Sequence, residues 1–157
     1  MRIEIASLSD IDSLTRLNSH VQGLHVRGAP HFFKASSVQE VATSFEEYLR
    51  QENASGFIAY VEDKAVGYLL ARVRERSGNA FLSAQTWMYI DQVSVEPDFQ
   101  GQGVGRGLMD AVLRYAREKG IREFEVETWV FNHAAQEFFA SFGFQPKTIQ
   151  SWLSDQS

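Results

Sequence analysis

A glycine-rich turn between a strand-like run and an apolar helix pattern constrains this chain more than any other stretch. Residues 88–95 have the pattern of a strand, Pro97 interrupts it, and four glycines follow closely, at positions 101, 103, 105 and 107. Glycine has no Cβ, so successive backbone N–H groups in such a turn can point at one ligand. The positive end of the next helix dipole lies at the same place. The turn therefore predicts a pyrophosphate-binding site.

The spacing of the glycines separates the possible kinds of phosphate-binding turn. A Walker loop needs Lys and then Ser or Thr after its last glycine, and here Arg106 follows Gly105. A dinucleotide fingerprint needs glycine at its sixth position, and no reading frame in this turn supplies it. The frame that fits is Gln100-x-x-Gly103-x-Gly105. A glycine-rich turn that binds no ligand is the alternative interpretation.

Length and composition limit the remaining possibilities. A chain of 157 residues with 44% hydrophobic residues is long enough for one domain with a sizeable core, so a single domain over 1–157 is expected. The chain has no cysteine, which excludes disulfides, a thiolate nucleophile and a cysteine-based zinc site. The formal net charge is −5 and no long basic tract occurs, which argues against nucleic acid as a ligand.

The sequence also bears on the compartment. The first residues lack the basic and apolar regions of a signal peptide, and no apolar run approaches the length of a membrane span. We therefore expect a cytoplasmic protein that does not associate with membranes.

Hydrophobic periodicity predicts ten elements in the order β-α-α-β-β-β-α-β-α-β. The predicted strands are 2–6, 57–62, 65–76, 88–95, 122–128 and 144–153. The predicted helices follow the apolar patterns of 11–24, 38–49, 104–116 and 132–142, with Ser36 or Ser37 as the cap of the second and Gly143 as the end of the fourth. One antiparallel hairpin and two parallel crossovers indicate an α/β protein with a mixed sheet and helices on both faces.

A second motif near the C-terminus consists of Asn132, Ala135, Phe139, Gly143 and Phe144. With the glycine turn and the element order, it resembles the GCN5-related N-acetyltransferase (GNAT) family over the whole chain. Among its members, the pattern is most similar to small amine or protein N-terminal acetyltransferases of bacterial type. The resemblance implies the GNAT-like fold and transfer of acetyl from acetyl-coenzyme A (acetyl-CoA) to a primary amine, without a metal. The acceptor would be a small-molecule amine or a protein N-terminus.

The resemblance also implies which residues bind acetyl-CoA. The backbone of Val93, Ser94 and Val95 would pair with the pantetheine arm. Asn132 would hydrogen-bond the same arm, although capping the last helix is an equally good interpretation. Phe139 would lie beside the cofactor. The pyrophosphate would be held by the turn, whose residues are Gln100, Gly101, Gln102, Gly103, Val104, Gly105 and Arg106.

Acetyl transfer to an amine needs a base, a donor to the developing oxyanion and a way to stabilise the leaving thiolate. The resemblance suggests Glu127 as the base and the backbone N–H of Val93 as the oxyanion donor. Glu127 alternates with apolar residues, so a solvated strand face is its alternative role. Asp91 is a second candidate, with a structural hydrogen bond as the favoured interpretation.

The sequence says less about which residues bind the acceptor amine. The segment that includes His25, His31 and Phe33 loosely resembles the substrate-binding segment of small family members, and its histidines are candidates for the acceptor pocket. An exposed edge strand also makes a homodimer plausible.

Phe139 is a departure from the family, which usually has a tyrosine acid at this position. Phenylalanine cannot donate a proton. The thiolate could leave unassisted, water could protonate it, or the protein could bind acyl-CoA without turnover. We favour an active enzyme that works by direct attack in a ternary complex, because no cysteine is present to carry an acyl group. A sensor or interaction module that binds acetyl-CoA is the alternative.

Overall fold

The computed structural model describes residues 1–157, which form two compact units, Met1–Glu127 and Thr128–Ser157. The strands are β1 (Arg2–Ile5), β2 (Ala54–Val61), β3 (Lys64–Arg76), β4 (Gln85–Val95) and β5 (Phe124–Val126). The α-helices are α1 (Ile11–Gly28), α2 (Val38–Leu49), α3 (Val104–Glu118) and α4 (His133–Ala140), and short 3-10 turns span Leu8–Asp10 and Pro97–Phe99. Only α4 belongs to the second unit. No helix has both the length and the apolar character needed to cross a membrane.

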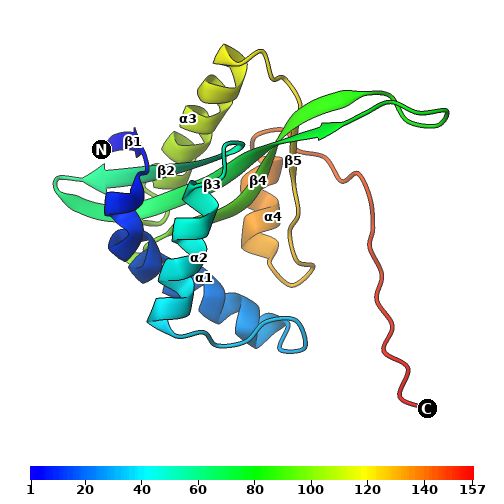
Figure 1. Ribbon diagram of the computed structural model, residues 1–157. Coiled ribbons are helices and arrows are strands. Elements are labelled where there is room, and N and C mark those ends of the chain that lie inside the picture. Colours follow the sequence, from blue (N-terminus) through cyan, green and yellow to red (C-terminus); the bar gives the residue numbers. More distant parts are fainter. The chain divides into compact units, whose positions relative to one another are not determined.

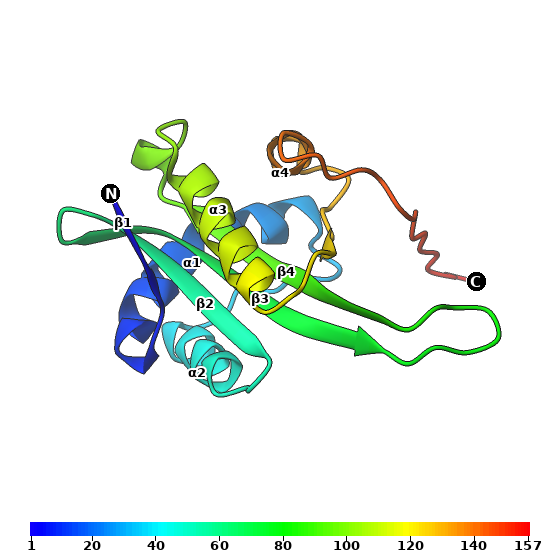
Figure 2. The same cartoon turned by 90° about the horizontal axis from the view of Figure 1, so that it is seen from above.

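The first unit is built on one mixed sheet in the order β1-β2-β3-β4-β5. Neighbouring strands are antiparallel except for β4 and β5, which are parallel. Helices α1 and α2 pack together on one face, and α3 covers the other (Figure 1 and Figure 2). The predicted fold class, a mixed sheet with helices on both faces, is therefore confirmed.

Each face of the sheet has its own apolar core. Beneath α1 and α2, a buried cluster includes Leu14, Leu17, Phe45, Tyr68 and Leu70. On the other face, α3 presents an apolar stripe whose members are each at most 2% exposed: Val104, Leu108, Met109, Val112 and Ala116. The sequence predicted this stripe with Tyr115 in place of Met109, and Tyr115 is only half-buried. Burying apolar surface on both faces fixes the sheet between the helices.

The start of α2 shows how local sequence sets a helix boundary. The Ser37 hydroxyl accepts a hydrogen bond from the Glu40 backbone N–H at 3.1 Å, and the Glu40 carboxylate accepts one from the Ser37 N–H at 2.7 Å. This capping box satisfies two N–H groups that the helix itself leaves unpaired. Ser37, rather than Ser36, is therefore the cap, and α2 begins at Val38.

The strands β3 and β4 extend past the other strands as a long two-stranded arm (Figure 2). Three arginines at alternate positions of β3 stack on aromatic rings. The pairs are Arg72 on Tyr48, Arg74 on Tyr89 and Arg76 on Trp87. Cation–π contacts of this kind hold the long arginine side chains in place.

Two strand predictions need correction. Residues 144–153 form no strand. Pro146 lacks a backbone N–H, and Ile149 and Leu153 are 94% and 87% exposed, so the segment has no apolar burial to favour a paired strand. The strand expected over 122–128 is limited to Phe124–Val126, because β4 pairs with it only from Met88 to Ile90.

Candidate active site

The glycine turn leads from the end of β4 into α3, as predicted. Gly101 and Gly103 have φ values of 73° and 85°, a region that side chains with a Cβ rarely adopt. Gly103 is the N-cap of α3, and no side chain caps this helix. The first N–H groups of a helix lack partners within it. A Cβ added to either glycine would meet nothing within 4 Å, so the space in front of the helix is open to a ligand.

Glutamine side chains hold this turn in place. Gln100 donates from Nε2 to the Val95 carbonyl at 3.0 Å, and Gln102 donates from Nε2 to the Asp98 carbonyl at 2.7 Å. Both side chains are thus used on the turn itself, which leaves its backbone to face a ligand. Together with the glycine geometry and the uncapped helix dipole, these contacts fit a pyrophosphate group.

Gly67 on β3 allows α3 to begin close to the sheet, and the sequence analysis missed it. A Cβ there would lie 3.0 Å from both the Ser94 carbonyl oxygen and Val104 Cγ1. The available signal was a glycine inside a strand, which often marks a close backbone approach. Because Val104 is the first residue of α3, Gly67 helps to set the position of the turn.

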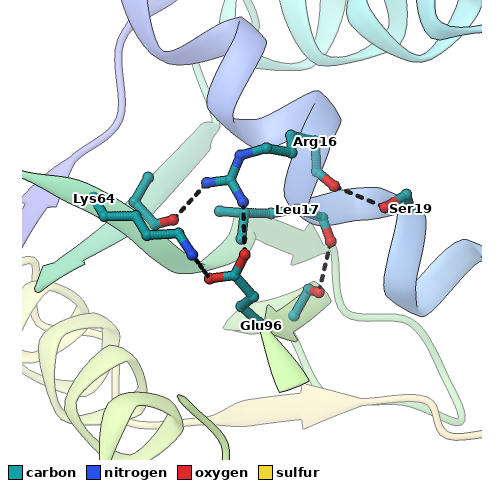
Figure 3. Close-up of polar contacts among 7 residues, drawn as sticks. Arg16, Leu17, Ser19, Lys64 and Glu96 are labelled. Atoms are coloured by element: carbon teal, nitrogen blue, oxygen red, sulfur yellow. Dashed lines mark hydrogen bonds and ion pairs between the residues drawn. The ribbon is translucent and has the colours of Figure 1, made fainter. Parts of the chain in front are cut away.

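Glu96, between β4 and the turn, is held by two cations (Figure 3). Its Oε1 lies 3.0 Å from Arg16 Nη1 and its Oε2 lies 2.7 Å from Lys64 Nζ. The hydrogen bond from Lys64, with the charges of Lys64 and Arg16, lowers the pKa of Glu96. Arg16 Nη2 also donates to the Ala65 carbonyl at 2.6 Å. The sequence analysis also missed this network, which connects α1 and β3 to Glu96, just before the turn.

The edge of β4 becomes free of β5 near its end. The last parallel pair is Ile90 with Val126, whereas β4 runs on to Val95. Within the first unit, the stretch beyond Ile90 therefore has a strand neighbour on one side only, and its Val93 lies opposite Leu69 of β3. The Ser94 side chain is 6% exposed and donates to the Leu17 carbonyl at 2.9 Å. Any contact of Ser94 with a ligand on this edge would thus come from its backbone, as predicted.

A β-bulge lies just before this edge. In the pairing of β3 with β4, Leu70 lies opposite Gln92 and Ala71 opposite Ile90, so Asp91 is an extra residue without a partner. Successive residues of a regular strand point to opposite faces, but a bulge breaks the alternation. Asp91 and Gln92 consequently line the same cavity.

That cavity has a volume of about 760 Å³ and lies between α1, α2 and the strands β3 and β4. Asp91 Oδ2 accepts hydrogen bonds from the Tyr48 hydroxyl at 2.7 Å and from Arg72 Nε at 2.6 Å. Burial and the bond to Asp91 raise the pKa of Tyr48, and the bond to Asp91 raises the pKa of Arg72. The structural hydrogen bond proposed for Asp91 is therefore present, within a cavity that could receive a second substrate.

A second set of hydrogen bonds joins two lining residues of the cavity, Asn18 and Gln92, through the buried Tyr68. Asn18 Nδ2 donates to the Tyr68 hydroxyl at 3.0 Å, and that hydroxyl donates to Gln92 Oε1 at 2.6 Å. Sequence analysis singled out neither Tyr48 nor these three residues, because their contacts join parts of the chain at least 24 positions apart.

Glu127 is exposed and follows directly after β5. It does not line the cavity. Since Val126 lies beside Ile90, Glu127 comes level with Asp91 in the parallel register. Burial raises the pKa of Tyr89. The negative charge of Glu127 and, to a smaller extent, that of Asp91 raise it further. The two carboxylate candidates thus lie at the end of the β4–β5 pairing.

The motif in the second unit has a clear structural role. Asn132 Oδ1 accepts a hydrogen bond from the Ala135 N–H at 3.1 Å and caps α4. Phe139 is 4% exposed and makes edge contacts with the rings of Phe138 and Phe144. The hydrogen bond expected of Asn132 as a helix cap is therefore present. The cofactor contacts of Asn132 and Phe139 stay predictions.

The three residues suggested for the acceptor side do not line the cavity. His25 stacks on Phe33 with ring centroids 4.7 Å apart, and burial lowers the pKa of His25. His31 is exposed. The cavity wall instead begins at Lys34, the next residue along the chain, so the roles of His25, His31 and Phe33 also stay predictions.

A glycine turn that fits pyrophosphate and a cavity that could receive a second substrate adjoin on one strand, a layout that would suit a group transferase. The sequence model of the acetyltransferase (GNAT) family matches residues 21–144. The chain belongs to this family, which confirms the resemblance and places the protein in the class of acetyl-CoA-dependent acetyltransferases.

Several curated relatives are similar over different lengths. An uncharacterized N-acetyltransferase, MJ1207 of Methanocaldococcus jannaschii, is 28% identical over 69% of this chain and 47% of its own, so the chain spans about half of that relative. An aminoglycoside N(6′)-acetyltransferase of Salmonella typhimurium is 30% identical over 64% of this chain and 68% of its own. An N-alpha-acetyltransferase of Sulfolobus acidocaldarius is 25% identical over 98% and 86%, respectively.

Solved structures share the fold. A tetramutant of the BH1408 protein from Bacillus halodurans has a TM-score of 0.92 at 21% identity and covers 98% of this chain and 99% of its own. An aminoglycoside N-acetyltransferase in complex with CoA has a TM-score of 0.73 at 20% identity, over 99% and 100% of the two chains.

Proposed function

We propose that the protein transfers the acetyl group of acetyl-CoA to a primary amine by direct attack in a complex that holds both substrates. One observation carries this proposal: the two sites adjoin along a single strand. Asp91 and Gln92 line the cavity, Val93 to Val95 form the free edge, and the glycine turn follows. A transferase needs its two substrates side by side, and proximity of this kind is a large part of catalysis.

The residues of the first unit fit acetyl-CoA, which would supply the reactive thioester. The backbone of 101–106 and the N-terminus of α3 would hold the pyrophosphate. The edge from Val93 to Val95 would pair with the pantetheine arm, and the Val93 N–H would donate to the oxyanion as it forms.

The two carboxylates have different surroundings and so receive different roles. Asp91 is fixed by Tyr48 and Arg72, which suits it to hold the ammonium form of the acceptor. Glu127 is exposed and can pass a proton to water, so we propose it as the base. Because the chain contains no cysteine, no thiol ester with the enzyme is part of this mechanism.

The relatives act on acceptors of two kinds according to their names, an aminoglycoside and a protein N-terminus. Both carry primary amines, which supports an amine acceptor for this chain. A cytoplasmic location and a homodimer also belong to the proposal.

Phe139 keeps a second candidate open, a module that binds acetyl-CoA without turnover. Its ring packs among other phenylalanines and offers no proton to a leaving thiolate. Calorimetry with acetyl-CoA, followed by thiol release over a panel of amines, separates the two. An enzyme binds and releases thiol with at least one amine, whereas a binding module binds and releases none above background.

A further inference from the structure

Glu96 lies at the corner where the chain leaves β4 for the 3-10 turn Pro97–Phe99 and the glycine turn beyond it. Its backbone N–H donates to the Val66 carbonyl at 2.8 Å. Its side chain is only 15% exposed, and each carboxylate oxygen lies beside a different cation, Arg16 of α1 or Lys64 of β3 (Figure 3). Because both its main chain and its side chain are held, the direction of the chain at this corner is fixed.

The contacts of this corner continue into the 3-10 turn. Lys64 Nζ lies over the Phe99 ring, 5.3 Å from its centroid. The Phe99 N–H donates to the Glu96 carbonyl at 2.9 Å, and Gln100 Nε2 donates to the Val95 carbonyl at 3.0 Å. Both ends of the 3-10 turn are thus held, so the glycine turn continues from a fixed starting point.

The glycine turn itself depends on what holds its two ends. A Cβ at Gly101 or Gly103 would meet nothing within 4 Å, so nothing packs against the turn on that side. After the turn, the buried Val104 lies close to Gly67 of β3, which fixes the start of α3. Before the turn, the contacts of Glu96 have this role. Backbone N–H groups bind an anion best when they are already oriented, because ordering them on binding would cost affinity.

The charge of Glu96 has the wrong sign for a direct contribution to binding of an anion. A carboxylate that precedes Gly101 by five residues repels an anionic cofactor, so its charge alone would weaken binding. Arg16 and Lys64 balance that charge and are held in turn, Arg16 also by the Ala65 carbonyl at 2.6 Å. Charge and geometry therefore predict effects of opposite sign when the carboxylate is neutralised.

We propose that Glu96 is a positioning residue for acetyl-CoA. Held by Arg16 and Lys64, it sets the direction in which the chain leaves β4 and so keeps the backbone N–H groups of 101–106 in the arrangement that receives the pyrophosphate. This inference rests on the proposed function, which assigns the pyrophosphate to this turn. It adds three residues that act on the cofactor through the turn.

Calorimetry with CoA measures the effect on binding. Glu96→Gln keeps the shape of the side chain and removes its charge, so affinity for CoA should fall by about tenfold. Lys64→Gln should cause a similar loss. In the double variant the loss should stay close to that of Glu96→Gln alone, because the two residues act as one unit. Glu46→Gln is the matched control, since it removes an exposed carboxylate of α2 whose partner is Arg50, and its affinity should equal that of the wild type.

Two acetyl donors distinguish positioning of the pyrophosphate from a general structural role. Acetyl-CoA carries the pyrophosphate, whereas S-acetylpantetheine presents the same thioester without it. With acetyl-CoA, Glu96→Gln should raise KM by about tenfold and change kcat by less than about twofold, because the lost interaction concerns binding. With S-acetylpantetheine, kcat/KM of this variant should equal that of the wild type.

An affinity for CoA that Glu96→Gln leaves unchanged or raises would overturn the inference, because charge alone predicts that result. A loss of the same size with both donors would also overturn it, since the defect would then not concern the pyrophosphate. So would additive losses in the double variant, which would mean that Lys64 contacts the cofactor directly. If the wild type binds CoA but releases no thiol with any amine, the proposed transfer fails, and the calorimetric losses still decide the inference.

Discussion

The glycine turn and the cavity adjoin on β4 but are built in opposite ways. The turn consists of consecutive residues, and its glutamines bond back to their own loop. The cavity is assembled from side chains of two helices and two strands, and Asp91 reaches it because of a bulge. A site made of backbone tolerates side-chain variation and suits a constant cofactor, whereas a site made of side chains can change its acceptor. We therefore expect substitutions in different parts of the molecule to have effects of different sizes.

The largest effect is expected at Gly103. Gly103→Val adds a branched side chain at φ 85° in the space where the ligand would lie, so affinity for acetyl-CoA should fall by about 10²-fold or more. Calorimetry measures it. Gly120→Val is the control, since Gly120 also has positive φ, 76°, and open space but lies past the other end of α3. Equal losses of affinity in both variants would point to backbone strain rather than to a lost binding site.

Replacing the proposed base should lower the rate by a comparable factor and leave the affinity for acetyl-CoA unchanged. Glu127→Gln retains the shape and removes the basic group, so kcat should fall by about 10²-fold at neutral pH and recover partly as pH rises. Affinity for acetyl-CoA should be unchanged. Glu123→Gln, an exposed glutamate that precedes β5, is the control. Wild-type rates for Glu127→Gln across the pH range would leave Glu127 as a surface residue.

A smaller effect is expected at Glu96, which lies just before the glycine turn. Two ion pairs lower the pKa of Glu96, so its contribution to stability is present above its usual pKa of 4.5 and is lost as pH falls through the lower folded value. Glu96→Gln should lower Tm by about 2–4 °C at pH 7. The difference from wild type should shrink as the pH falls below 4.5. A difference that stays constant with pH would mean that charge is not the cause.

The smallest change is expected at Phe139. Phe139→Tyr adds a phenol that could donate to a leaving thiolate, so turnover should be maintained or raised if chemistry limits the rate. Phe138→Tyr, on the neighbouring ring, is the control for an added hydroxyl. Clear wild-type turnover that only Phe139→Tyr abolishes would show that this ring contacts a substrate and tolerates no hydroxyl.

The same contrast explains what the sequence could reveal. The glycine turn, the caps at Ser37 and Asn132 and the apolar stripe of α3 depend on residues a few positions apart, so local patterns predicted them. The bulge at Asp91 depends on the register between two strands, which no local pattern encodes. Tyr48 and Asp91 are 43 positions apart, and their bond became visible only in the folded chain. The strand expected over 144–153 does not form, because Pro146 lacks a backbone N–H and the apolar side chains of the segment find no burial.

The central claim is that acetyl moves from acetyl-CoA to an amine while both substrates are bound. Its most direct test is to measure initial rates while the concentrations of both substrates are varied. A neutral tetrapeptide amide with a free amino terminus serves as acceptor, and mass spectrometry of the product locates the acetyl group. We predict intersecting lines in double-reciprocal plots and one acetyl group on the amino terminus. Parallel lines, which indicate a covalent acetyl-enzyme, or thiol release without an acetylated amine would contradict it.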